Sequence, residues 1–281
     1  MVQKMGASAG CYGFRLDGVD GARDLLVGVP AGWPGLELRV RPAAGPVPAM
    51  DVVGPRHARL PLHASGWMEI ERDPSRITFH LPEPSPGHEE LVHPYLAPSA
   101  AVLARWTSRE AFHAGVIGVG EGAWAVLGDR ESGKSSTLGW LAARGLPVLA
   151  DDLLVLDAGH ALAGPRCIDL RQDAAQRLDA GEPLGVVGTR ERWRLRLGPV
   201  AARVPLRGWV VLEWGDEVAV EPVRGAARLT ELIPHRSVRL EPPEPGTLVE
   251  LASLPVLRLR RPRRWDSLPL ALDQLLAAVE P

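Results

Sequence analysis

The chain has 281 residues, which is enough for one large domain or two small ones, and 46% of them are hydrophobic, so a sizeable core is available. The formal net charge of -2 argues against a general nucleic-acid binder or membrane-surface binder, because both need a basic field. There is no run of about 18 apolar residues that would span a bilayer, and the N-terminus does not resemble a signal peptide. We therefore expect a cytoplasmic protein that binds neither nucleic acid nor membrane, and we leave open whether it forms a homo-oligomer.

Proline and glycine punctuate the first hundred residues, with short strand-like runs between them. The run 36–41 alternates apolar and polar residues, as a half-buried strand does. The runs 68–71 and 77–81 alternate in the same way on either side of a turn sequence, which predicts a β-hairpin. We predict a small β-rich N-terminal region over residues 1–94 and a larger domain over residues 95–281.

The larger region begins with a predicted helix over Ala97–Glu110 and two strands, 116–119 and 124–127, joined by a tight turn. A glycine loop follows the second strand. A helix is predicted over 134–144 and a buried strand over 146–150. The order strand, glycine loop, helix, strand predicts a βαβ-type unit.

Further downstream the pattern is simpler to interpret. Strands are predicted at 153–156, 208–213 and 217–220, and a closing amphipathic helix at 265–279. The basic run Arg258–Arg264 is interpreted as a solvated helix edge rather than a binding patch.

The glycine loop matches the phosphate-loop pattern G-x4-G-K-S, directly after an apolar strand and at the start of a helix. Its backbone N–H groups and the helix N-terminus are suited to bind phosphate, and Lys134 would reach the β- and γ-phosphates. The chain has only one other lysine, Lys4, so a lysine inside this loop is not explained by composition. We predict that ATP, with GTP as an alternative, and Mg²⁺ are bound by Gly128, Asp129, Arg130, Glu131, Ser132, Gly133, Lys134, Ser135 and Ser136. The Glu131 side chain should point to solvent.

Two adjacent carboxylates, Asp151 and Asp152, end the strand that follows the loop helix. Active groups gather at the carboxyl ends of parallel strands, so this pair should face the phosphates. One carboxylate would hold Mg²⁺ and the other would take the proton of an attacking hydroxyl, although the sequence does not say which is the base. We predict Asp151, Asp152 and His113 as catalytic residues, and Ser135 with Asp152 as metal ligands.

The remaining candidate ligands for a metal are interpreted as structural. Cys11 and Cys167 lie far apart in the sequence and form no metal-ligand cluster, which fits a reducing compartment. Seven histidines are interpreted as surface or packing residues: His57, His63, His80, His88, His93, His160 and His235.

The stretch from His113 to about Leu178 resembles the catalytic domain of HPr kinase/phosphorylase and its relatives. The resemblance lies in the His113-Ala114-Gly115 segment, the glycine loop, the Asp151-Asp152 pair and the following 165–171 segment, in that order. It implies an α/β fold, a P-loop kinase domain of the HPr kinase/PEP carboxykinase type, and ATP-dependent phosphorylation of a serine hydroxyl. The chain carries Arg130-Glu131 where the HPr enzyme has a Ser-Gly, and it looks more like the HPr-kinase-like proteins of ribosomally made peptides, notably lasso peptides.

We therefore expect an ATP-dependent serine kinase that acts on a peptide or small protein, with a lasso-peptide precursor as one acceptor. Arg171 or an arginine within 190–194 would steady the transferring phosphoryl group. Two alternatives stay open: a nucleotide-binding regulatory or scaffold module that transfers nothing, and a small-molecule kinase.

Overall fold

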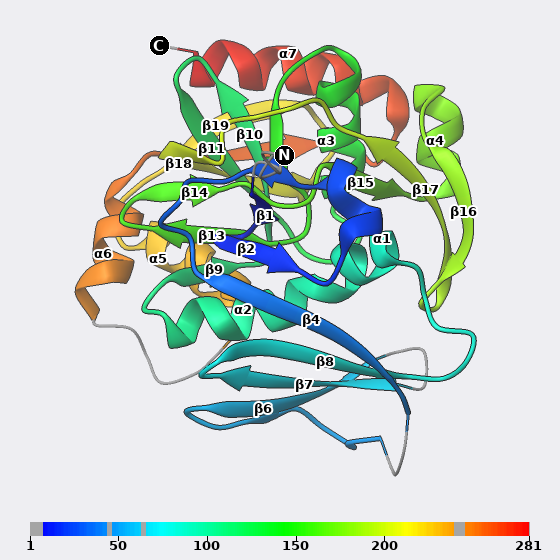
Figure 1. Cartoon of the computed structure of the whole chain (residues 1–281). Helices are drawn as coiled ribbons and strands as arrows, with labels where there is room; N and C mark the ends of the chain where they lie inside the picture. The colour runs from blue at the N-terminus through cyan, green and yellow to red at the C-terminus, as the bar shows by residue number, and fades with distance from the viewer. Residues whose placement is uncertain (1–7, 44–46, 63–65, 239–244, 281) are drawn as a thin grey trace, which may run out of the picture.

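The computed structural model describes residues 8–43, 47–62, 66–238 and 245–280. Over these residues the chain has a mixed α/β fold with three sheets. Figure 1 shows the strands β4, β8, β7 and β6 at one end of the molecule and the helix α7 (Leu268–Val279) at the other. None of the helices in this part of the chain combines the length and the apolar character that a membrane-spanning segment needs.

The first sheet lies within the β-rich N-terminal region that the sequence predicts. Among the described residues it has eight strands: β3 (Val27–Gly28), β1 (Ala9–Cys11), β2 (Phe14–Asp17), β4 (Gly35–Pro42), β8 (Ser75–Leu81), β7 (Gly66–Arg72), β6 (His57–Leu62) and β5 (Val52–Val53), in spatial order. The β7–β8 hairpin and the strand over 36–41 are confirmed. Alternate residues of these strands, such as Leu36, Leu38, Ile77 and Phe79, are buried.

The helix that links the two large sheets ends earlier than the sequence predicts. A short irregular segment, η2 (Leu91–Tyr95), leads into α2 (Leu96–Trp106), after the single turn α1 (His88–Glu90). Extending this helix to Glu110 was wrong, because Ser108 adopts a left-handed backbone (φ 60°) and Glu110 starts the strand β9 (Glu110–Phe112). The predicted boundary at residue 94 lies inside η2, and one hydrophobic core spans the first sheet, α2 and parts of the later chain.

The second sheet carries the predicted glycine loop. Its main path in the described residues is β12 (Val148–Ala150), β10 (Ala114–Val119), β11 (Gly122–Leu127), β18 (Arg203–Trp214), β14 (His160–Leu162), β13 (Leu154–Asp157) and β9, with β20 (Val256–Arg261) beside β18 and β19 (Ala219–Val223) beside β20. Strands β11, β18 and β20 are parallel. The strands β11 and β12 also run in the same direction, but β10 lies between them and is antiparallel to both. The predicted βαβ-type unit therefore forms across an intervening strand.

Both faces of the second sheet are covered, which explains its continuous apolar runs. Val126 and Val210 belong to the core under α3 (Lys134–Ala143) and α7, whereas their neighbours Leu127 and Trp209 belong to the core on the opposite face. The opposite face is covered by α5 (Ala227–Leu232) and α6 (Pro245–Ser253), which Figure 1 shows on the side away from α3. The predicted closing helix is confirmed as a short turn, 265–267, followed by α7.

A small third sheet completes the wall beside the glycine loop. It consists of β15 (Cys167–Leu170), β17 (Arg190–Arg196) and β16 (Glu182–Val187), and β15 leads into α4 (Gln172–Leu178). The basic run 258–264 was wrongly interpreted as a helix edge, because its first half is the central strand β20, paired on both sides. Arg261, the last residue of that strand, is 6% exposed.

Candidate functional site

The glycine loop connects the end of β11 to the start of α3. Gly133 has a left-handed backbone (φ 87°), and a Cβ atom there would lie 2.8 Å from Arg261 Nη2 and 3.1 Å from the Trp214 ring. Glycine is required here both by the left-handed backbone and by the lack of space for a Cβ atom. The first hydrogen bond of the helical ladder runs from the Thr137 N–H to the Gly133 carbonyl oxygen (2.9 Å), and Gly133 supplies no side-chain cap. The amides of the first turn of α3 are thus free to bind an anion.

Lys134 is buried inside this loop. Its Nζ atom donates to the Gly128 carbonyl oxygen (3.1 Å) and lies 3.1 Å from His113 Nε2. Burial lowers the pKa of Lys134, while the carboxylates of Asp151 and Asp152 oppose that shift. No ion pair of Lys134 occurs among the residues that the structure describes, so the ammonium group is available to a bound anion.

Asp151 lies behind the loop and is also buried. The Ser135 hydroxyl donates to its carboxylate, at 3.1 Å from Oδ1 and 3.5 Å from Oδ2. Burial and the neighbouring Asp152 raise the pKa of Asp151. A buried carboxylate beside a hydroxyl, without a cationic side chain bonded to it in the described part of the chain, is the type of oxygen pair that suits a divalent cation.

Asp152 and His113 face the cavity in front of the loop. His113 Nδ1 lies 3.0 Å from the Asp152 carbonyl oxygen, and its Nε2 lies 3.1 Å from Lys134 Nζ. A neutral ring that donates from Nδ1 and accepts at Nε2 satisfies both contacts. The surrounding protein and the Lys134 ammonium lower the pKa of His113, which keeps the ring neutral near pH 7.

A cavity of about 1130 Å³ opens in front of these residues. One side is formed by the loop with His113 and Asp152. A second side is rich in arginine and tryptophan: Arg171, Arg190, Arg192, Trp214, Arg261 and Arg263. A third side is apolar and brings the first sheet and α2 to the site through Val53, Leu60, Pro94, Ala97, Ala101 and Val102. The cavity is therefore larger and less polar than a phosphate site alone requires.

Arg261 is the functional candidate that the sequence interpretation missed. Its guanidinium lies 4.4 Å from the centre of the Trp214 ring, and Trp214 Nε1 in turn donates to the Glu131 carbonyl oxygen (3.3 Å). The Arg261 guanidinium donates one hydrogen bond among the described residues, to the Pro262 carbonyl oxygen (3.3 Å). Burial lowers the pKa of Arg261 to about 10. The position could have been found, because Arg261 ends a strand that runs parallel to β11 and so lies at the same edge of the sheet.

Of the arginines that were predicted instead, Arg171, Arg192 and Arg194 lie beside carboxylates. Arg171 donates to Glu131 Oε1 (2.9 Å), and Arg194 forms two hydrogen bonds with Asp169, at 2.9 and 3.0 Å. The Glu131 side chain is half-exposed, as a solvent-facing side chain should be, and it bonds to Arg171 beside the cavity that both residues line. Arg190 and Arg192 line the cavity.

The structure brings the predicted site residues together with one difference in arrangement. Asp129, Arg130, Glu131, Gly133, Lys134, Ser135, Ser136, His113 and Asp152 line the cavity, whereas Gly128, Ser132 and Asp151 lie behind it. Ser135 was expected to share a metal with Asp152, but the carboxylate beside its hydroxyl is that of Asp151. Of the histidines assigned to packing, His235 lies beside the loop and accepts from the His113 N–H through its carbonyl oxygen (2.7 Å), and His63 lies outside the described residues.

No family model and no curated protein matches this chain in sequence. Among solved structures, the chain is similar to the Hpr(Ser) kinase/phosphatase from Coxiella burnetii, with a TM-score of 0.29 and 12% identity over 60% of this chain and 95% of that chain. A likeness at this level establishes neither a family nor an activity. It also leaves the peptide-tailoring branch without support.

Proposed function

We propose that the chain binds a magnesium nucleotide on the glycine loop and transfers the terminal phosphoryl group of ATP to a hydroxyl group. The observation that supports the proposal most directly is the loop itself. It combines uncapped first-turn amides and a buried lysine with the hydroxyl of Ser135, which donates to the buried carboxylate of Asp151 at the end of β12. GTP is the alternative nucleotide.

The metal-binding role falls to Ser135 and Asp151. Mg²⁺ prefers oxygen ligands and, when bound here, would neutralise charge on the phosphates. The buried Asp151 carboxylate has an oxygen lone pair left over beside the Ser135 hydroxyl, and a cation would offset the burial of its charge. We assign the ion to this pair instead of Ser135 and Asp152.

The phosphate-binding role falls to three kinds of donor. The first-turn amides of α3 bind through the backbone, which carries partial positive charge at the helix N-terminus. Lys134 would exchange its bond to the Gly128 carbonyl oxygen for a phosphate oxygen. Arg261 adds a planar donor that is held against Gly133 by Trp214 and has no carboxylate partner among the described residues.

Asp152 is the residue that we assign as general base. It lines the cavity and lies outside the metal pair, so its carboxylate can accept the proton of an acceptor hydroxyl. The hydroxyl oxygen then bonds to the terminal phosphorus as the bond from phosphorus to the nucleoside diphosphate breaks. His113 is a positioning residue, because its ring holds the Asp152 carbonyl oxygen on one side and Lys134 on the other.

The acceptor region is the apolar side of the cavity between the loop and α2. Its residues, among them Leu60, Ala97 and Val102, fit a serine that is presented with neighbouring apolar side chains, as on a peptide or small protein. The reason for the scaffold alternative is the Arg130-Glu131 centre of the loop. That reason weakens, because Arg171 donates to Glu131 and offsets its charge.

The proposal is tested by titrating the protein with Mg·ATP and Mg·GTP and by incubating it with labelled ATP and panels of serine peptides, including precursor peptides, and of hydroxylated metabolites. Lys134→Ala should abolish saturable nucleotide binding, and Lys4→Ala, which changes the other lysine of the chain, should not. Label on a peptide supports the serine kinase, and label only on metabolites supports the small-molecule kinase. Binding without any transfer supports the scaffold, and no binding at all refutes the proposal.

A further inference from the structure

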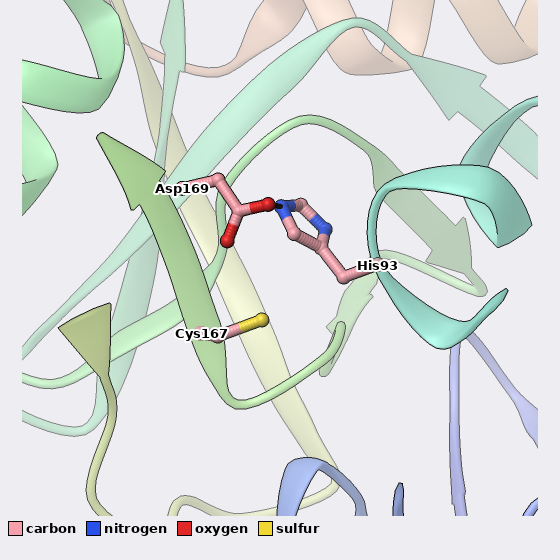
Figure 2. Close-up of side chains that lie close together, drawn as sticks. All are labelled: His93, Cys167 and Asp169. Atoms are coloured by element: carbon pink, nitrogen blue, oxygen red, sulfur yellow. Dashed lines mark ion pairs between the residues drawn. The ribbon is translucent and has the colours of Figure 1, made fainter. Parts of the chain in front are cut away.

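A group of buried side chains beside the glycine loop was not expected from the sequence. His93 comes from η2, and Cys167 and Asp169 come from β15. A ring nitrogen, the thiol sulfur and a carboxylate oxygen of these residues all lie within 4.8 Å of one another. Figure 2 shows the imidazole facing the carboxylate, with the thiol on the same side of the strand. The prediction that Cys167 takes part in no ligand cluster is therefore wrong, because residues two apart on a strand share one face.

The His93 ring is the least satisfied member of the group. It is 1% exposed, and its Nε2 atom has no hydrogen-bond partner among the described residues. The nearest carboxylate oxygen is Asp169 Oδ2 at 3.8 Å, which is longer than the limit of about 3.2 Å for an N–H···O bond. A buried ring nitrogen without a partner is unfavourable by about 1–3 kcal/mol, so a missing partner is expected at this point.

The 3.8 Å between His93 Nε2 and Asp169 Oδ2 is too long for a direct hydrogen bond and fits two ligands of one cation. Ligand atoms that lie about 2.0–2.3 Å from one tetrahedral ion are separated by roughly 3.3–3.8 Å. Nitrogen, thiolate and carboxylate together are a ligand set that selects zinc, whereas Mg²⁺ prefers oxygen ligands alone. We infer that His93, Cys167 and Asp169 form a structural zinc site, with water or a neighbouring carboxylate as the fourth ligand. As the sulfur–metal bond forms, the thiol proton leaves to solvent.

The surrounding residues would hold these ligands in place. Arg194 donates to both oxygens of Asp169 and, through Nη2, to the His93 carbonyl oxygen (2.7 Å). A carboxylate has about four lone-pair sites. Arg194 uses two of them and Arg192 Nη1 lies 3.7 Å from Oδ2, so Asp169 keeps a site for an ion. Contacts of this kind orient metal ligands in known sites.

The zinc site would connect two walls of the cavity. Pro94 and Ala97, which follow His93, line one wall, and Asp169 and Arg171 line the other. A ring nitrogen of His93 also lies within 4.8 Å of carboxylate oxygens of Asp151 and Asp152, so an ion held here would brace the strand ends that carry the catalytic pair. The inference stands on this cluster alone and does not depend on phosphoryl transfer.

The site is tested on the full-length protein, purified without chelator, by measuring its metal content. We expect stoichiometric zinc. After removal of the metal, addition of Co²⁺ should produce the near-ultraviolet thiolate-to-cobalt absorption, and zinc should raise the Tm of the metal-free protein. Absence of zinc together with absence of the cobalt band in the wild-type protein overturns the inference, whether or not any variant folds.

Two variants locate the metal. Cys167→Ser and His93→Gln should lose the thiolate band or the zinc-dependent rise in Tm, with folding checked by circular dichroism. Cys11→Ser is the matched control, because Cys11 is also a buried free cysteine but lies outside the ligand group. A band that survives in Cys167→Ser, or that disappears equally in Cys11→Ser, contradicts the assignment. Titration of the same samples with Mg·ATP tests the proposed nucleotide binding separately from the zinc site.

Discussion

Charged side chains lie in different surroundings on the first sheet and at the edge of the second sheet that carries the glycine loop. On the first sheet, several of them form ion pairs near the surface: Glu37 accepts from Arg39 (2.7 Å) and Arg76 (2.8 Å), and Glu69 accepts from Arg59 (3.1 Å). At the loop edge of the second sheet, Lys134, Asp151 and Arg261 are all buried, and no ion pair of theirs occurs among the described residues.

This difference separates charges that serve the fold from charges that serve a ligand. Exposed ion pairs contribute little to stability, because water screens them and they can be lost without much effect. Buried charges without partners are unfavourable and persist only where something else offsets them. The loop edge therefore has the electrostatic character of a binding site, and the first sheet does not.

The largest effect is expected from Asp152→Asn. Removing the proposed base should lower turnover roughly 100- to 10,000-fold while nucleotide affinity stays largely intact, because the Ser135 hydroxyl bonds to Asp151 and not to Asp152. Single-turnover kinetics with labelled ATP measures the turnover, and equilibrium titration measures the nucleotide affinity. Asp151→Asn is the comparison and should instead raise the Mg²⁺ concentration required. If turnover survives both changes, the assignment of the base is wrong.

The second-largest effect is expected from Gly133→Ala, which changes the shape of the glycine loop and thereby the nucleotide affinity. In Gly133→Ala the new Cβ would collide with Arg261 and Trp214 in addition to straining a positive φ, so we expect nucleotide affinity to fall roughly 100-fold, about 2.7 kcal/mol. Gly145→Ala is the control, because Gly145 has a similar φ of 83° but open space around it. It should lose only stability, by about 1 kcal/mol. Equal nucleotide affinities for the two variants would contradict the role of Gly133.

Arg261→Met should move affinity and stability in opposite directions. Loss of one charged donor weakens nucleotide binding by about 1.5–3 kcal/mol, which is roughly 10- to 100-fold. Removal of an unpaired buried guanidinium should raise the Tm of the ligand-free protein. Arg260→Met, on the same strand and beside Glu213, is the control and should leave affinity unchanged. A drop in Tm without loss of affinity would show that Arg261 serves the fold alone.

The smallest expected effect is a weak pH dependence of the stability of the protein, which arises from His80 in the first sheet. Burial lowers the pKa of His80 although Glu69 opposes the shift. A lowered pKa in the folded state means that the stabilisation is present above the unfolded value of about 6.5 and is lost as the pH falls through the folded value. The Tm measured from pH 7.5 to pH 5 should fall less steeply in His80→Gln than in the wild-type protein or in the surface variant His57→Gln. If the Tm of His80→Gln falls with pH as steeply as that of the wild-type protein, His80 does not contribute to the pH dependence of stability.

Local patterns predicted the central strands of the first sheet and the elements around the glycine loop, but not the edge strands of the first sheet or the third sheet. Alternation in the runs 36–41 and 68–81 gave the central strands of the first sheet, and the apolar runs around the glycine loop gave β10, β11, α3 and β12. The sequence predictions failed where pairing with a strand far away in the sequence determined the secondary structure. Glu110 left its predicted helix to pair with Leu156 in β13, and the basic run 258–264 became a central strand because β18 and β19 bind both of its edges.

The sequence alone determined the spacing of the loop and of the carboxylate pair, because both depend on contacts within a few residues of backbone. Only the tertiary structure decided that Asp151 and not Asp152 lies beside Ser135, that Arg261 lies against Gly133 of the loop, and that His93 meets Cys167 and Asp169. These are contacts between segments far apart in the chain, and the packing of separate elements fixes them. No local periodicity records that packing.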